Sequence, residues 1–201
     1  MIILKSTNLS RDWNVYHKGV GTSKNMHLNT NSSSNTGEYW TVNSNTFSIQ
    51  DYSVSSDWIA YSFASKRGVS KVGSFVGTGA AGNKVYTGFE PAWILTKRSS
   101  SAGADWAIID NKRSTDSDKN DYLRANSNAI EGASGSGITF DTDGFTFSGA
   151  SFNTSNATHI YYAVAKNTNE TSLIPDTNLQ LHLDADSFPE YGEDGHSNTP
   201  S

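Results

Sequence analysis

Two close pairs of aspartates could each supply two oxygen ligands to a calcium ion. Asp141 and Asp143 precede Gly144, and Asp184 and Asp186 end an alternating stretch near the C-terminus. An EF-hand loop needs further oxygens and a glutamate after its glycine, and the Phe-Thr-Phe that follows offers neither. An Asp-Gly step between two apolar stretches is typical of a hairpin turn. We therefore predict a hairpin at residues 141–144 and no metal site there, whereas the second pair remains open.

Residues 77–82, Gly-Thr-Gly-Ala-Ala-Gly, match the G-x-G-x-x-G pattern of dinucleotide-binding loops. That chemistry requires a helix directly after the glycines, because the helix N-terminus binds the pyrophosphate. The residues that follow, Asn83–Tyr86, have the alternating character of a strand instead. We predict a hairpin turn and no nucleotide cofactor.

The histidines are scattered and show neither the H-E-x-x-H spacing nor any other paired spacing of a metal site. They are His17, His27, His159, His182 and His196. A G-x-S-x-G nucleophile elbow is absent, and no two carboxylates stand out as the acid and base of a glycosidase. The sequence therefore predicts no catalytic residue, no metal ligand and no cofactor, which indicates that the protein is not an enzyme.

Composition narrows the class of protein further. Charged residues make up 17% of the 201 residues and aromatic residues 11%, while Asn, Ser, Thr and Gly are abundant. This combination is typical of β-sandwiches with polar loops, and the aromatic content argues against disorder. The net charge of −5 gives no basic footprint for nucleic acid. Cysteine is absent, and we expect neither a signal peptide nor a membrane span.

The stretch Trp58–Ala64 predicts a central strand, because its Trp, Ile, Tyr and Phe residues favour strands and the run is short for a helix. Alternation places Ile59, Tyr61 and Phe63 on one face, which we interpret as the core face. A stretch of the same character, Ile160–Ala165, follows about a hundred residues later. The two copies suggest an internal repeat.

Further matches occur upstream in the same order. They are Ile3-Leu4-Lys5 with Ile94-Leu95-Thr96-Lys97, Trp13 with Trp106, Leu28 with Leu123, Phe47 with Phe145, and Ile59 with Ile160. The offset grows from 93 (106 − 13) to 101 (160 − 59), as expected when insertions accumulate in loops and strands stay fixed. We infer a duplication.

The expected strands and turns give an all-β fold of two tandem homologous β-sandwich (jelly-roll-like) modules, because no helical period continues beyond two turns. The expected boundaries are 1–78 for the first module, 79–171 for the second, and 172–201 for a linker, an edge strand and a flexible tail. In the second module, a long charged loop is expected at Asn111–Asn120.

Exposed aromatic rings form stacking platforms for sugars, whereas aromatic residues in strands usually fill cores. Trp13 and Trp106 occupy equivalent repeat positions, which favours a role in the core or between sheets. Trp40 lies beside the polar loop Asn29–Gly37 and has no obvious partner in the repeat. It is the tryptophan that we select as a candidate ligand platform.

Four stretches of the chain occur together in a characteristic order: Trp13–Gly19, Trp58–Ala64, Val72–Gly79 and Val85–Trp93. They resemble a family of tandem β-modules encoded by tailed, often marine, bacteriophages and found in virion or tail-fibre-like proteins. The resemblance covers roughly Ile2–Thr168 and implies a virion structural or host-contact role without catalytic residues. Leu179–Ser187 is similar to the first strand of laminin-G or concanavalin-like lectin domains, whose carbohydrate-binding loops would lie beyond Ser201.

The function that we expect is structural: a non-enzymatic capsid decoration, head-fibre or tail-fibre module located in a virion. It would act through contacts with other virion proteins or with copies of itself. The alternative is a carbohydrate-binding module that contacts host surface glycans through loop amides and an exposed tryptophan. A polysaccharide-degrading enzyme ranks last, because no acid/base pair stands out.

Overall fold

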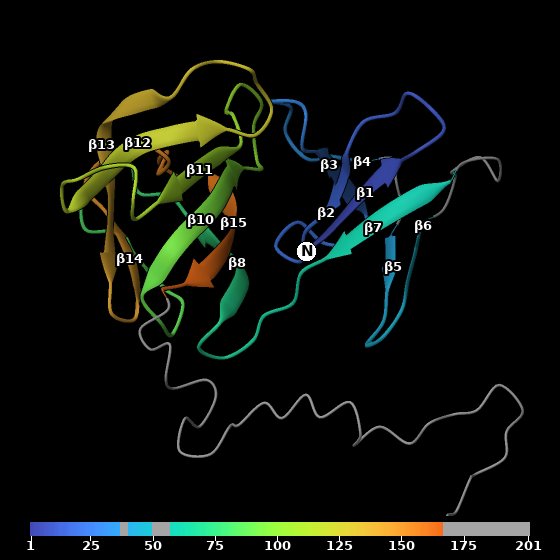
Figure 1. The fold of residues 1–201 in the computed structure, drawn as a ribbon, viewed down its shortest axis with the longest axis horizontal. Coiled ribbons are helices and arrows are strands. Elements are labelled where there is room, and N and C mark those ends of the chain that lie inside the picture. Colours follow the sequence, from blue (N-terminus) through green and yellow to red (C-terminus); the bar gives the residue numbers. More distant parts are fainter. Residues whose placement is uncertain (37–39, 50–56, 167–201) are drawn as a thin grey trace, which may run out of the picture. The chain divides into compact units, whose positions relative to one another are not determined.

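The protein is described by a computed structural model in which residues 1–36, 40–49 and 57–166 are placed. These residues form strands, turns and loops and contain no helix, so the predicted all-β fold is confirmed (Figure 1). The predicted linker, edge strand and tail at 172–201 lie outside the described residues, and so do Asp184, Asp186, His182 and His196. Nothing in the described part of the chain is a helix long and apolar enough to span a bilayer.

The first module contains a five-stranded antiparallel sheet in the order β4-β3-β2-β1-β7. Its strands are β1 (Ile2–Ser6), β2 (Asn14–Tyr16), β3 (Lys24–His27), β4 (Asn35–Thr36) and β7 (Trp58–Ser62). A separate hairpin of β5 (Trp40–Val42) and β6 (Phe47–Ile49) packs its apolar residues against Ile2 and Leu4 of β1. The hairpin and the sheet are thus the two layers of this module.

The second module is one eight-stranded antiparallel sheet in the order β8-β15-β10-β11-β12-β13-β14-β9. Its strands are β8 (Ser70–Val76), β9 (Lys84–Tyr86), β10 (Pro91–Arg98), β11 (Ala107–Asp110), β12 (Asp118–Arg124), β13 (Gly132–Asp141), β14 (Gly144–Phe147) and β15 (Thr158–Ala165). The two end strands, β8 and β9, follow each other in the sequence but do not pair with each other. The sheet curls so that Phe75 of β8 contacts Phe145 and Phe147 of β14.

The order and register of the strands support the duplication. Five strands of the first module, β7-β1-β2-β3-β4, have the same order as β15-β10-β11-β12-β13 of the second. In the first module Lys5 pairs with Ile59, and in the second Lys97 pairs with Ile160. The sequence match of Ile59 with Ile160 therefore has the correct register.

A hydrogen-bond network is repeated as well. In the first module the Asn29 side chain accepts the backbone N–H of Trp13 at 2.9 Å and donates to Asp12 at 2.7 Å. In the second module Asn126 accepts the backbone N–H of Trp106 at 2.7 Å and donates to Asp105 at 2.8 Å. The same Asp-Trp…Asn arrangement thus fixes the entry to β2 and to β11.

Strand pairing also corrects one of the residue matches of the repeat. Leu28 was matched to Leu123, but the pairing of Asn14 with His27 and of Ala107 with Arg124 makes His27 the counterpart of Arg124. The counterpart of Leu123 is therefore Met26, two residues earlier. A shift by two keeps side chains on the same face of a strand, so the sequence pattern alone does not reveal it.

Three apolar clusters form the core. One lies inside each module, and the third contains residues from both sheets, including Ile3, Val15, Leu95, Trp106 and Ile160. The predicted position of Trp106 between sheets is confirmed, and its indole Nε1 donates to the backbone carbonyl of His27 at 2.9 Å. This shared cluster joins the modules, and residues Met1–Lys166 form one compact unit.

The strand assignments differ from the expected module boundary at residue 78. β8 precedes that boundary, yet it pairs along its whole length with β15 of the second module. The change from one sheet to the other therefore falls between Ser62 and Ser70.

Candidate functional site

Trp40, the candidate ligand platform, is buried with only 3% of its surface exposed. Its ring lies 5.6 Å from the ring of Tyr16 and 6.3 Å from that of Phe47, and its indole N–H donates to Asn25 at 3.3 Å. The ring offers no face to a sugar, so this choice is wrong. When the β5–β6 hairpin is aligned with the β13–β14 hairpin, Trp40 takes the position of Ile138, which is a core residue. The sequence comparison did not find this equivalence.

The aspartates of the 141–144 turn contact a lysine. Lys84 Nζ lies 2.7 Å from Asp143 Oδ1 and 3.7 Å from Asp141 Oδ2, and the hydrogen bond to Asp143 raises the lysine pKa. Thr146 Oγ1 donates to Asp141 at 2.6 Å. The predicted hairpin is confirmed, since Asp141 pairs with Gly144.

The glycine-rich loop at 77–82 connects β8 to β9 and is followed by a strand, as predicted. It is not a hairpin, because β8 and β9 pair with different neighbours. The Asn153 side chain accepts the N–H of Thr78 at 3.0 Å and donates to the carbonyl of Ala80 at 2.8 Å. The loop is thus held by the 148–157 segment.

Two of the histidines in the described residues are buried. Burial lowers the pKa of His17 to about 4; its Nδ1 accepts the N–H of Gly19 at 3.0 Å and its Nε2 lies 3.1 Å from the carbonyl of Tyr161. Burial lowers the pKa of His159 to about 4 as well, and the cationic side chains of Arg98 and Lys97 lower it further. Both imidazoles are neutral at pH 7.

A cavity of about 180 Å³ lies beside His159 in the second module. Arg98 enters it from β10, Tyr122 from β12, and Phe152 from the loop before β15. The rings of Tyr122 and Phe152 pack edge to face at 5.0 Å. Phe152 has a φ of 57°, a left-handed conformation that a non-glycine residue adopts at a cost of about 1–3 kcal/mol. The cavity therefore combines aromatic edges, a guanidinium and a strained residue.

Lys97 forms the buried wall of this cavity. Its Nζ donates to the carbonyls of Ala104 at 2.7 Å, Arg98 at 3.1 Å and Asn31 at 3.3 Å, and burial lowers its pKa to about 8. Asn31 belongs to the first module, so one ammonium group joins loops of both modules. In the first module the equivalent Lys5 donates to the carbonyl of Arg11 in the same way.

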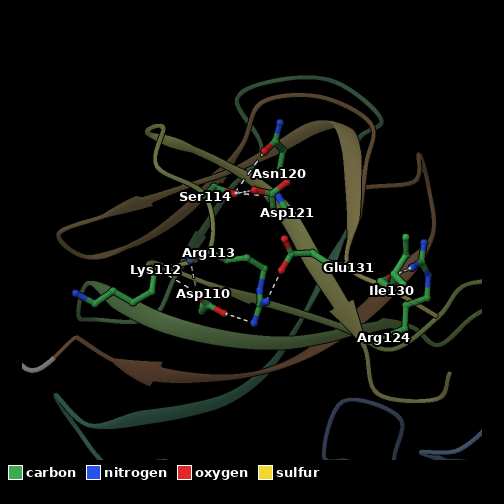
Figure 2. Close-up of polar contacts among 9 residues, drawn as sticks. All are labelled: Asp110, Lys112, Arg113, Ser114, Asn120, Asp121, Arg124, Ile130 and Glu131. Carbon is green, nitrogen blue, oxygen red and sulfur yellow. Dashed lines mark hydrogen bonds and ion pairs between the residues drawn. The ribbon is translucent and has the colours of Figure 1, made fainter. Parts of the chain in front are cut away.

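Charged side chains brace the β11–β12 loop (Figure 2). The loop covers residues 111–117, which is shorter than the expected Asn111–Asn120, because β12 begins at Asp118. Asp110 accepts the backbone N–H groups of Lys112 at 2.9 Å and Arg113 at 2.8 Å, and these bonds and Arg113 hold its pKa below the usual value. Arg113 also pairs with Glu131, next to the exposed Ile130. These contacts stabilise the conformation of the loop.

The outer edge of β7 carries exposed apolar side chains. Ile59 is 47% exposed and Tyr61 is 45% exposed, which corrects their interpretation as core residues. Phe63 of the same face does pack on the shared cluster, 5.0 Å from the ring of Tyr162. Sequence alternation identifies the face of a strand but not whether a neighbouring strand covers it.

Two cavities open on this side of the first module. One, of about 320 Å³, is lined by apolar residues that include Leu4, Phe47, Ile49 and Ala60. The other, of about 390 Å³, lies between Ile2 and Tyr16 on one side and residues 42–47 on the other. Both lie along the inner face of the β5–β6 hairpin. The sequence contains a signal for these cavities: residues 70–89, which contain β8 and β9 of the second module, have no matching stretch in the first copy of the repeat.

Residues 1–168 match the model of a family described as Domain of unknown function (DUF7483). The match covers most of the chain, and the protein therefore belongs to this family. No curated protein and no solved structure matches the chain.

Proposed function

We propose that this protein is a structural component of a bacteriophage virion that acts through protein–protein contacts, as a capsid decoration, head-fibre or tail-fibre module. The observation that carries the proposal is that three strands at sheet edges have exposed apolar side chains. Ile59 and Tyr61 on β7, Val76 on β8 and Tyr86 on β9 are all exposed apolar residues. Soluble proteins usually protect such edges with charges or short strands, because an open edge pairs with other chains.

The location in a virion rests on the resemblance of residues 13–19, 58–64, 72–79 and 85–93 to tandem phage modules. The shared cluster between the modules adds physical support, since it makes the duplicated unit one compact block suited to repeated contacts. Exposed apolar residues at interfaces exclude water and contribute to association in proportion to the area they bury.

Self-association is tested by light scattering over a concentration series. We expect a mass above the 21.7 kDa of one chain. Replacing Ile59 and Tyr61 with lysine should shift the mass toward the monomer, whereas the control Asn128→Lys, at an exposed position of the second module, should not. A strict monomer at every concentration would contradict self-association and leave contacts with other virion proteins.

A carbohydrate-binding role is the second candidate, and the cavity beside Arg98, Tyr122 and Phe152 favours it. Its volume of about 180 Å³ is below the roughly 300–1,000 Å³ of pockets for drug-sized ligands, so it would take one sugar-sized group. Aromatic rings with a few polar groups suit the apolar faces and hydroxyls of sugars. A glycan array tests this candidate: binding that Arg98→Ala abolishes would support it, and an empty array would count against it.

A further inference from the structure

Equivalent strands of the two modules differ in what lies beside them. In the second module β15 pairs with β10 on one side and with β8 on the other, from Thr158↔Val76 to Val164↔Ser70. In the first module the equivalent strand, β7, pairs with β1 on one side, and no other described strand pairs with it (Figure 1). Likewise β14 pairs with β9, whereas β6 has only β5 among the strands described. Two ladder positions that are filled in the second module are therefore not filled by any described strand in the first.

The same difference appears in the cores. In the second module Phe75 of β8 inserts between the sheet and β14, with its ring 5.0 Å from that of Phe147 and 6.3 Å from that of Tyr161. Register makes Ile49 the counterpart of Phe147 and Ala60 that of Tyr161. Both counterparts line the 320 Å³ cavity of the first module. The position in the first module that corresponds to the Phe75 ring is thus an apolar cavity.

The second cavity corresponds to the other strand. Val85 of β9 pairs with Phe145 and belongs to the core of the second module. Phe47, the counterpart of Phe145, lines the 390 Å³ cavity together with residues 43–46. One cavity therefore lies where β8 would insert its phenylalanine, and the other where β9 would pack.

We propose that this open side of the first module binds a strand–turn–strand segment of another protein chain with the chemistry of residues 70–89. The first strand of that segment pairs antiparallel with the outer edge of β7 and inserts an aromatic ring into the hollow beside Ile49 and Ala60. The second strand pairs with β6 and covers Phe47. Backbone pairing provides affinity, and the two apolar pockets select the side chains.

This inference names the partner chemistry for the protein–protein contacts proposed above, and it rests on that proposed function. The two remain separable. Absence of peptide binding by a protein that is found in virions would overturn the strand docking alone. Absence from virions would overturn the virion role and leave a measured peptide affinity in place.

The test uses a fluorescent synthetic peptide with the sequence of residues 69–90, titrated against the full chain and followed by anisotropy. We expect saturable binding and slower hydrogen exchange at the amides of β7. A peptide with the Phe75→Ala change should bind about 100-fold more weakly, because truncating a buried phenylalanine costs about 3 kcal/mol.

A matched pair of protein variants completes the test. Ala60→Arg fills the hollow from an exposed position and should abolish binding without changing the melting temperature, whereas the exposed Asn128→Arg should bind as the wild type does. Three results would overturn the proposal: no binding, binding that Ala60→Arg leaves intact, or faster exchange in β8 without protection at β7. The last would mean that the peptide had displaced the chain's own β8 from β15.

Discussion

His17 of the first module and Tyr161 of the second are joined by a hydrogen bond across the two sheets, from the imidazole Nε2 to the backbone carbonyl at 3.1 Å. The other ring nitrogen, Nδ1, accepts the N–H of Gly19. This pairing requires the neutral tautomer with its proton on Nε2, because a protonated Nδ1 would face a second N–H group. Protonation of Nδ1 would remove the bond from Gly19, whereas both the neutral and the protonated ring donate from Nε2 to Tyr161.

The pH dependence of stability follows from the burial of His17, which lowers the pKa of the imidazole although its bond to Tyr161 raises it. The folded-state pKa of His17 is about 4, below the ordinary value of 6.5, so the unfolded chain binds the proton more tightly. The contribution of His17 to stability should be constant above about pH 6.5 and fall as the pH drops toward 4, by up to about 3 kcal/mol. Denaturant unfolding at pH 7, 6 and 5 measures the slope. His17→Gln should reduce the slope by about half, because the lowered pKa of His159 contributes over the same pH range. An unchanged slope in this variant would contradict the assignment.

Trp106 should be the most sensitive residue between the modules. It is 1% exposed and donates a hydrogen bond to the carbonyl of His27, so truncation leaves a cavity and removes that bond. We expect Trp106→Ala to lower the free energy of unfolding by about 3–5 kcal/mol. The control is Ile130→Ala, at a side chain 88% exposed, which should change it by less than about 0.5 kcal/mol. Equal effects in urea titrations would contradict the described packing.

Lys97 should stabilise the junction of loops through its three carbonyl partners. Lys97→Met keeps most of the apolar stem but removes the donor from all three carbonyls. The carbonyl of Asn31 keeps the N–H of Gly103 at 3.0 Å, and a buried carbonyl left unpaired costs about 1–3 kcal/mol. The exposed Lys112→Met is the matched control, with an expected change near zero. Thermal unfolding of the two variants checks the difference, and a neutral Lys97→Met would show that water satisfies these carbonyls.

Gly77 should tolerate no side chain, because its backbone approaches another segment closely. A Cβ added there would lie 2.1 Å from the carbonyl oxygen of Thr154, whereas one added at Gly135 would meet nothing within 4 Å. We expect Gly77→Ala to destabilise the protein by about 1–3 kcal/mol or more, and Gly135→Ala to have little effect. Thermal unfolding followed by circular dichroism gives the melting temperature of each variant. Equal melting temperatures would contradict the close approach at Gly77.

The sequence allowed prediction of the all-β fold, the repeat and the 141–144 hairpin, because these depend on local alternation and turn residues. Trp40 was misjudged because its burial depends on Ile2, Leu4 and the hairpin, which are far apart along the chain. The exposure of Ile59 and Tyr61 was missed for a similar reason: a strand has the same pattern whether or not a neighbour covers its edge. The cavity beside His159 is lined by segments that are far apart in the sequence, and no residue spacing indicates that they lie together.

The measurement that tests the proposed virion role most directly is whether this chain is present in purified phage particles. Particles purified on a density gradient would be analysed by quantitative mass spectrometry. The proposed role predicts the chain in fixed stoichiometry with the major virion proteins, and cross-links from β7, near Ile59 and Tyr61, to a neighbouring chain. Its absence from the particles, with abundant protein in the lysate, would contradict a virion role.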